Sequence, residues 1–277
     1  TETNLAEYYI TIAGNSVMDR IPSVTDVKNT VIRESKIVRL DGMEADLSRY
    51  YVYAEGVILD AYANPAKAIT VAEDYMGVVD GFKKTNADGF NGMTRGEAFY
   101  RPMLEVVNYL LENEFIVYIC SGTNRFTVRA LIDGVIDIPA RQVIGTDFTI
   151  VASGQGEEMD MHYNYVEKDE LLMGDTVITK NVKMSKVAQL EQELGQRPVL
   201  VFGNSTGDVP MAVYAEEENE YLTEVFFLLC DDLEREHGNE SKAQKIADIC
   251  AEKGWVTISM ANDWTTIYGE NVTTNPQ

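Results

Sequence analysis

After residue 97, the apolar positions form short runs in which every residue is apolar, and these runs alternate with segments of helical spacing. The runs cover residues 115–120 (FIVYIC), 199–202 (VLVF) and 225–230 (VFFLLC), and residues 256–259 form a weaker fourth run. Strands that are apolar on both faces are typical of a parallel sheet covered by helices on both sides. We therefore expect an α/β fold for this part of the chain.

The segments between these runs have apolar residues at helical spacing. Leu104, Val107 and Leu110 share one helical face, with Pro102 suited to the first residue of the helix and Asn113 to its end. Other expected helices include residues 129–132 and a segment through residue 194 that ends at Gly195. Residues 143–152 predict either one extended hairpin or two short strands.

Residues 1–95 carry no clear strand pattern. Their apolar residues recur at helical spacing, as at Leu5, Tyr8 and Ile12. Asp-Gly and Asn-Gly turn signals between residues 86 and 96 mark the best boundary. We expect a mostly helical domain at residues 1–95 and an α/β domain at residues 96–277.

The amino-acid composition excludes some classes of binding partner. The 277 residues include 23 Lys and Arg against 45 Asp and Glu, a formal net charge of −22. Such a chain repels phosphate backbones and anionic membranes, so we expect no nucleic-acid partner. No apolar stretch approaches the roughly 18 residues that a membrane span needs. The three cysteines, which are too few for a disulfide scaffold, are expected to be free and mostly buried.

Two polar, glycine-containing segments follow the expected strands. Ser121 and Gly122 come directly after residues 115–120, and residues 203–208 (GNSTGD) come directly after residues 199–202. Ligands of open α/β sheets bind at the carboxyl ends of the strands, where loop N–H groups and helix N-termini favour anions. Lys183 precedes the helix that leads to the second segment. A hydroxyl, an ammonium group and an amide–carboxylate pair suit a phosphoryl group with Mg²⁺.

Each of these pieces alone has an ordinary structural explanation. A Ser-Gly pair after a strand is usually a turn, and a Lys before a helix is usually a solvated surface charge. Their order at successive strand ends is more specific. Other chemistries have less support, since His162 and His237 have no partners at metal-ligand spacing. The chain also lacks a nucleophile elbow, a dinucleotide fingerprint and a phosphate-binding Walker loop.

In this order the segments resemble the haloacid dehalogenase (HAD) superfamily, and within it the phosphoserine phosphatase-like branch. The resemblance covers roughly residues 97–232, and residues 1–95 would be the helical cap domain over a Rossmann-like core. Ser121 matches the second motif of the family. Lys183 matches the third motif, with Lys186 as the competitor, and Asn204 and Asp208 occupy the two acidic places of the fourth.

Two departures from the family pattern stand out. Asn204 replaces an acidic residue, and its amide oxygen can bind Mg²⁺ but brings no charge. The first motif, DxDx[TV], is not found, because neither Asp60 nor Asp147 has the second acid. Either the sequence starts just after that motif, or the protein is a non-catalytic member. We expect the first, since the motif-bearing strand would lie centrally between the strands at residues 115–120 and 199–202, where its loss would unpair buried backbone groups.

The resemblance implies a Mg²⁺-dependent phosphatase that hydrolyses a small organic phosphomonoester through a phospho-aspartyl intermediate. The implied roles are hydrogen bonding by Ser121, charge neutralisation by Lys183, metal binding by Asn204 and Asp208, and substrate contact by the Gly122 backbone and Glu2. The alternative is a non-catalytic protein of the same fold that binds phosphate or a small ligand. The substrate, the oligomeric state and the compartment, cytoplasmic or exported, are not assigned by the sequence.

Overall fold

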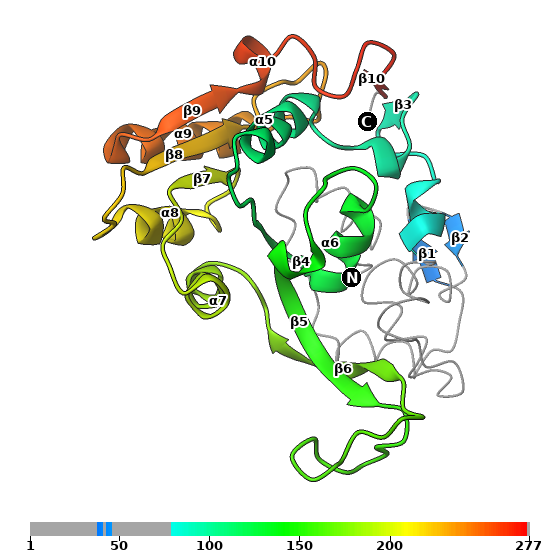
Figure 1. Ribbon diagram of the computed structural model, residues 1–277. Coiled ribbons are helices and arrows are strands. Elements are labelled where there is room, and N and C mark those ends of the chain that lie inside the picture. Colours follow the sequence, from blue (N-terminus) through cyan, green and yellow to red (C-terminus); the bar gives the residue numbers. More distant parts are fainter. Residues whose placement is uncertain (1–37, 41–42, 46–78, 276–277) are drawn as a thin grey trace.

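The computed structural model describes residues 38–40, 43–45 and 79–275. The described chain is a mixed α/β structure with parallel and antiparallel strands (Figure 1). Two sheets of three strands each carry most of it, in the orders β4-β5-β6 and β7-β8-β9. The α/β class expected from the sequence is therefore confirmed.

The sheet β7-β8-β9 is entirely parallel. It consists of β7 (Leu200–Gly203), β8 (Glu224–Leu229) and β9 (Val256–Ser259), linked through α8 (Val209–Glu216) and α9 (Glu240–Lys253). These strands match the three apolar runs expected at residues 199–202, 225–230 and 256–259 to within one residue at each end. Their apolar residues pack on both faces, as that pattern predicts.

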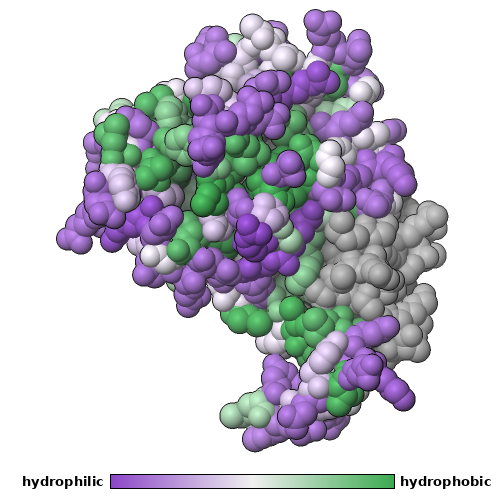
Figure 2. All heavy atoms as spheres, viewed as in Figure 1, coloured by the Kyte–Doolittle hydropathy of each residue, from purple (hydrophilic) through white to green (hydrophobic). Residues whose placement is uncertain are grey.

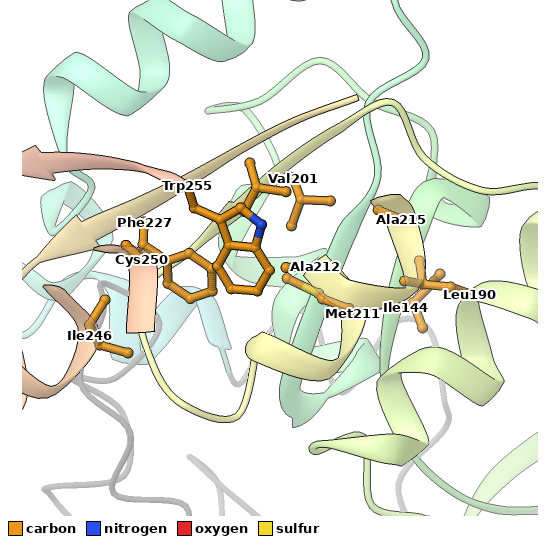
Figure 3. Close-up of a cluster of buried hydrophobic side chains, with 11 residues drawn as sticks. Ile144, Leu190, Val201, Met211, Ala212, Ala215, Phe227, Ile246, Cys250 and Trp255 are labelled. Atoms are coloured by element: carbon orange, nitrogen blue, oxygen red, sulfur yellow. The ribbon is translucent and has the colours of Figure 1, made fainter. Parts of the chain in front are cut away.

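Consecutive residues of β8 show how the two faces are filled. Phe227 is fully buried and stacks on Trp255, with ring centroids 5.4 Å apart, in the cluster drawn in Figure 3. Leu228 points to the other face, where it packs in a cluster with Trp264 and Tyr268. A single strand thus holds the helices α8 and α9 on one side and the carboxyl-terminal segment on the other.

The second sheet differs from expectation. It consists of β4 (Ile119–Asn124), β5 (Val143–Ala152) and β6 (Leu171–Thr179); β5 is parallel to β4 and antiparallel to β6. The hairpin β5-β6 projects away from the rest of the structure (Figure 1). The strand expected at residues 115–120 was wrong, since β4 begins and ends four residues later. The reason is that pairing with β5 starts only at Ile119.

The two interpretations offered for residues 143–152 were also wrong. These residues form one strand of ten, whose partner is the segment Leu171–Thr179. The sequence analysis missed β6, since Gly174 and Asp175 interrupt its apolar pattern. The pairing of β5 with β6 shifts register on both sides of Phe148, and the second shift lies opposite residues 174–176.

The helices confirm the sequence analysis. Helix α5 (Arg101–Glu112) has Pro102 in its first turn and ends at Asn113. Helix α7 (Met184–Leu194) ends at Gly195, whose φ of 64° is the left-handed conformation of a helix end. Further helices are α6 (Arg125–Ile132) and the short α10 (Met260–Asp263), and residues 79–83 are also helical. Two 3-10 helices cover Arg95–Glu97 and Ala140–Gln142. Within the described residues, no helix is both long and apolar enough to cross a membrane.

Part of the amino-terminal half is described. Strands β1 (Val38–Leu40) and β2 (Met43–Ala45) form an antiparallel pair, so the helical expectation was wrong for these residues; strands this short show no alternation in the sequence. Strand β3 (Phe90–Asn91) pairs with β10 (Thr273–Thr274), and Phe90 packs with residues near the carboxyl end. The other predicted cap helices lie outside the described residues, as do Glu2 and Asp60.

An ion-pair network joins strand β5 to helices α6 and α7. The Arg125 guanidinium donates to both carboxylate oxygens of Asp147, at 2.8 Å each, and to Glu193 at 2.8 Å. Gln189 also donates to Asp147, at 3.2 Å. Asp147 therefore fixes α6 and α7 to β5, which gives this carboxylate a structural role.

Glu236 is a buried carboxyl, only 4% exposed, near the carboxyl-terminal segment. It accepts hydrogen bonds from the Tyr268 hydroxyl and from the His237 backbone N–H. Burial raises the pKa of Glu236 above its usual range, despite these two donors. The folded state therefore favours the neutral acid, and this contribution to stability is lost as pH rises through the folded-state pKa.

We predict that Glu236→Gln changes stability in a pH-dependent way. Gln carries no charge and can still accept from His237, while its amide donates to the Tyr268 oxygen. The difference in Tm, variant minus parent, should increase from pH 4 to pH 8. The increase should be roughly 2–4 °C for each kcal/mol that the variant gains over the parent in free energy of unfolding. Thermal unfolding followed by circular dichroism checks this, with the exposed Glu234→Gln as the matched control for loss of one charge. A difference in Tm that stays flat with pH would contradict it.

Candidate functional site

A cavity of about 1170 Å³ lies between strands β4 and β7. Residues of both strands and of the loops after them line it. Among the lining residues are five that the sequence analysis singled out: Ser121, Gly122, Lys183, Asn204 and Asp208. The structure therefore brings the two polar segments together, but Ser121 and Gly122 lie within β4 and not in a loop after it, because the strand is shifted by four residues from its expected place.

Lys186 connects the two polar segments. Its Nζ donates to the Cys120 carbonyl oxygen and to Asp208 Oδ1, each at 2.7 Å. The side chains of Lys186 and Asp208 are only 9% and 8% exposed. One buried ammonium group thus ties β4, at Cys120, to the loop that follows β7.

The sequence analysis preferred Lys183 over Lys186 as the lysine of this site. Lys183 lies just before α7, is exposed, and has a positive φ of 52°. Lys186 lies in the first turn of α7, on the helix face that is turned toward the sheets. The structure therefore places Lys186, and not Lys183, against Asp208, while Lys183 lines the same cavity.

Asp208 organises the loop between β7 and α8. Its Oδ2 accepts from the backbone N–H groups of Asn204 and Ser205, at 3.1 and 3.0 Å, and from the Ser205 hydroxyl at 2.9 Å. Gly203 makes this tight loop feasible, because a Cβ there would lie 2.6 Å from the Phe227 ring. The loop conformation depends on these contacts of Asp208.

Side-chain donors hold the irregular part of β4, where its pairing with β5 shifts register between Cys120 and Asn124. Three successive carbonyl oxygens, those of residues 120–122, accept in turn from Lys186, from Asn181 at 2.8 Å and from Thr146 at 2.6 Å. The Thr123 N–H donates to Ser121 Oγ at 3.1 Å. Because this oxygen already accepts a backbone hydrogen bond, the hydroxyl proton is available for another acceptor.

Asn181 and Thr146 are positioning residues that the sequence analysis missed. Both are buried, and the Asn181 N–H also donates to Thr146 Oγ1 at 3.2 Å. Thr146 is a polar residue inside β5, and Asn181 is a polar residue just after β6; neither stands out from its neighbours in the sequence. Only the packing of β5 and β6 brings them beside the part of β4 that carries Ser121.

The cavity differs in charge from the protein as a whole. Of its described lining residues five are basic and two acidic, in a chain of net charge −22. The basic residues are Lys180, Lys183, Lys186, Arg197 and Lys245, and the acidic ones are Glu114 and Asp208. Burial raises the pKa of the Cys120 thiol, which therefore stays neutral at neutral pH. The walls favour an anionic ligand.

The Mg²⁺ site expected at Asn204 and Asp208 does not fit the described residues. Mg²⁺ requires close to six oxygen ligands, usually including carboxylates. Both oxygens of Asp208 are already occupied, one by Lys186 and the other by three donors of its own loop. Within the described ranges, no three His, Cys, Asp or Glu side chains lie close enough together to hold a metal. We therefore assign Asp208 to loop structure.

A scan against protein-family models and a search of curated proteins gave no match to this chain. Its function is therefore inferred from the residues that line the cavity.

We predict that Asp208→Asn destabilises the protein by about 3–5 kcal/mol, because it leaves the Lys186 ammonium buried without a counter-charge. The double variant Lys186→Met with Asp208→Asn should recover much of this loss, since no unpaired charge is then buried. The coupling free energy between Lys186 and Asp208 is measured by urea unfolding of the parent, both single variants and the double variant. Additive effects of the two substitutions would show that the pair does not interact.

Proposed function

We propose that the cavity between β4 and β7 binds the phosphoryl group of a small organic phosphomonoester, and that the protein is a phosphatase of the haloacid dehalogenase type. The observation that carries this proposal is the excess of basic residues around the cavity of a strongly acidic protein. Charge complementarity of this kind concentrates an anionic ligand at the site. The helical cap and the Rossmann-like core of that family belong to the same proposal.

The described side chains have separate roles in binding the phosphoryl group. The Ser121 hydroxyl, whose oxygen accepts from Thr123, donates its proton to a phosphoryl oxygen. The exposed ammonium group of Lys183 neutralises charge at the rim of the cavity. Lys186 acts indirectly, because it holds β4 and the loop after β7 in place through Cys120 and Asp208.

The chemical step needs groups beyond these residues. The resemblance implies an aspartate nucleophile and Mg²⁺, and the described residues supply a complete set for neither. We therefore assign phosphoryl binding and charge neutralisation to them. The proposal therefore leaves the nucleophile and the metal ligands to residues outside the described ranges.

One observation favours a second function, namely phosphate binding without catalysis. The carboxylates among the described lining residues are Asp208, which is paired with Lys186, and Glu114, which precedes β4. Within the described part of the chain, neither is placed to attack a phosphoryl group held by Ser121. A protein limited to these groups would bind phosphate and release it unchanged.

Phosphate binding should depend on Ser121. A hydrogen bond to a charged group contributes about 1.5–3 kcal/mol, so Ser121→Ala should weaken binding of inorganic phosphate roughly tenfold to a hundredfold. Titration followed by ³¹P NMR measures the affinity. Ser153→Ala, in the projecting hairpin, is the matched control and should bind like the parent. Equal affinity of the parent and Ser121→Ala for phosphate would overturn the proposed site.

Hydrolysis of an aryl phosphate by the same protein separates the two candidate functions. A phosphatase releases the phenol in a reaction that EDTA suppresses and Ser121→Ala slows. A binding protein shows the ³¹P titration without release of the phenol.

A further inference from the structure

The projecting hairpin β5-β6 exposes a large share of the apolar side chains on the described surface. Among the described residues, eight of the sixteen exposed large apolar side chains lie between residues 150 and 178. Figure 2 shows apolar residues on this hairpin beside hydrophilic ones. The segment that joins the two strands, residues 153–170, is the hairpin tip. It carries four of the eight: Met159, Met161, Tyr165 and Val166. Exposed apolar side chains that gather in this way mark interaction sites.

Hydrogen bonds within the tip fix its backbone. The buried Gln155 side chain accepts from the Ala152 N–H at 3.0 Å and donates to the Glu158 carbonyl oxygen at 2.8 Å. The buried Asp169 carboxylate accepts from the Tyr163 hydroxyl at 2.8 Å and from two backbone N–H groups of the tip at 2.9 Å each. Because the tip is ordered before a partner arrives, binding costs less conformational entropy.

The tip consists of turns and irregular backbone. The His162 N–H donates to the Met159 carbonyl oxygen at 2.8 Å, and the Asp169 N–H donates to the Val166 carbonyl oxygen at 2.9 Å. Backbone of this kind has no continuous edge with which a strand could pair. A partner is therefore recognised through its side chains, as happens when the apolar face of an amphipathic helix packs on an apolar surface.

The tip is strongly acidic. Six of its residues are Asp or Glu, whereas Lys168 is its one Lys or Arg. Glu157, Glu158 and Asp160 flank the exposed methionines and are themselves exposed. Repulsion between like charges disfavours a second copy of the tip, a nucleic acid or an anionic membrane as the partner. Charge complementarity favours a basic partner.

We propose that the hairpin tip binds a basic, amphipathic helical segment of a partner protein. Methionine side chains suit this role, because they are unbranched, adapt to apolar surfaces of different shape and make favourable contacts with aromatic rings. The apolar face of the helix would pack on Met159, Met161 and Tyr165, and its flanking basic side chains would lie near Glu157 and Glu158. The proposal rests on the exposure and charge of the tip, and does not depend on phosphate binding.

Two synthetic peptides test the proposal on the full chain. The probe is acetyl-KLAKLAKKLAKLAK-amide, whose apolar residues share one face of a helix. The control, acetyl-KLLKAAKAKKLLKA-amide, has the same composition and charge but spreads its apolar residues around the helix. Non-specific attraction to the acidic protein is therefore the same for both peptides. Isothermal titration at roughly 0.15 M salt should give the probe an affinity at least about tenfold higher than that of the control.

Methionine methyl NMR locates the bound peptide. The signals of Met159 and Met161 should shift with the probe, whereas that of Met184, which is 65% exposed on α7, should not. Met159→Ala combined with Met161→Ala should weaken binding of the probe roughly tenfold. Met184→Ala is the matched control and should bind the probe like the parent. All three side chains are exposed, so these variants should keep the fold.

The contribution of charge is tested separately. Glu157→Gln combined with Glu158→Gln should weaken binding of the probe roughly twofold to tenfold and reduce its salt dependence. Glu217→Gln combined with Glu218→Gln removes the same charge from an exposed acidic pair after α8 and should leave the affinity unchanged.

Three results would overturn the proposal. One is that the probe binds no better than the control peptide, or that neither binds. Another is that the signals of Met159 and Met161 stay in place at a saturating concentration of the probe. The third is that the protein forms a dimer in analytical ultracentrifugation and that Met159→Ala with Met161→Ala dissociates it, since a second copy would then occupy the tip.

Discussion

The buried ammonium group of Lys186 is the contact on which the candidate site depends. It reaches two groups that belong to different sheets, the Cys120 carbonyl and the Asp208 carboxylate, each at 2.7 Å. Because both side chains are largely withdrawn from water, loss of either partner leaves the charge of the other buried without a counter-charge. This bridge therefore fixes the loop after β7 relative to β4.

The two polar segments gain their shape from contacts between residues that are distant in the sequence. Asn181 and Thr146 hold the carbonyl groups beside Ser121 from 60 and 24 residues away. Asp208 orders its own loop through contacts with residues three and four positions before it. The result is a basic cavity in an acidic protein, with a serine hydroxyl free to donate. These features support phosphate recognition more directly than they support metal binding.

Apolar patterns predicted the strands β7, β8 and β9, helices α5 and α7, and the meeting of the two polar segments, but placed β4 four residues too early. This succeeded because strands buried on both faces and helices with one apolar stripe have distinct periodicities. The same reasoning missed β6, whose pattern is interrupted at Gly174, and preferred Lys183 to Lys186. Two lysines three positions apart look alike in a sequence, and only the start of α7 decides which one faces the sheets. The sequence pattern did not reveal the positioning role of Asn181 and Thr146, because that role depends on the packing of β5 and β6.

The central claim is that Lys186 is buried and bonded to Asp208, and NMR of ¹⁵N-labelled lysine ammonium groups tests it most directly. The account predicts a cross-peak from a slowly exchanging ammonium group at neutral pH, absent in Lys186→Met and moved in Asp208→Asn. Fast exchange of every lysine ammonium group, or a Lys186 signal that Asp208→Asn leaves in place, would contradict it.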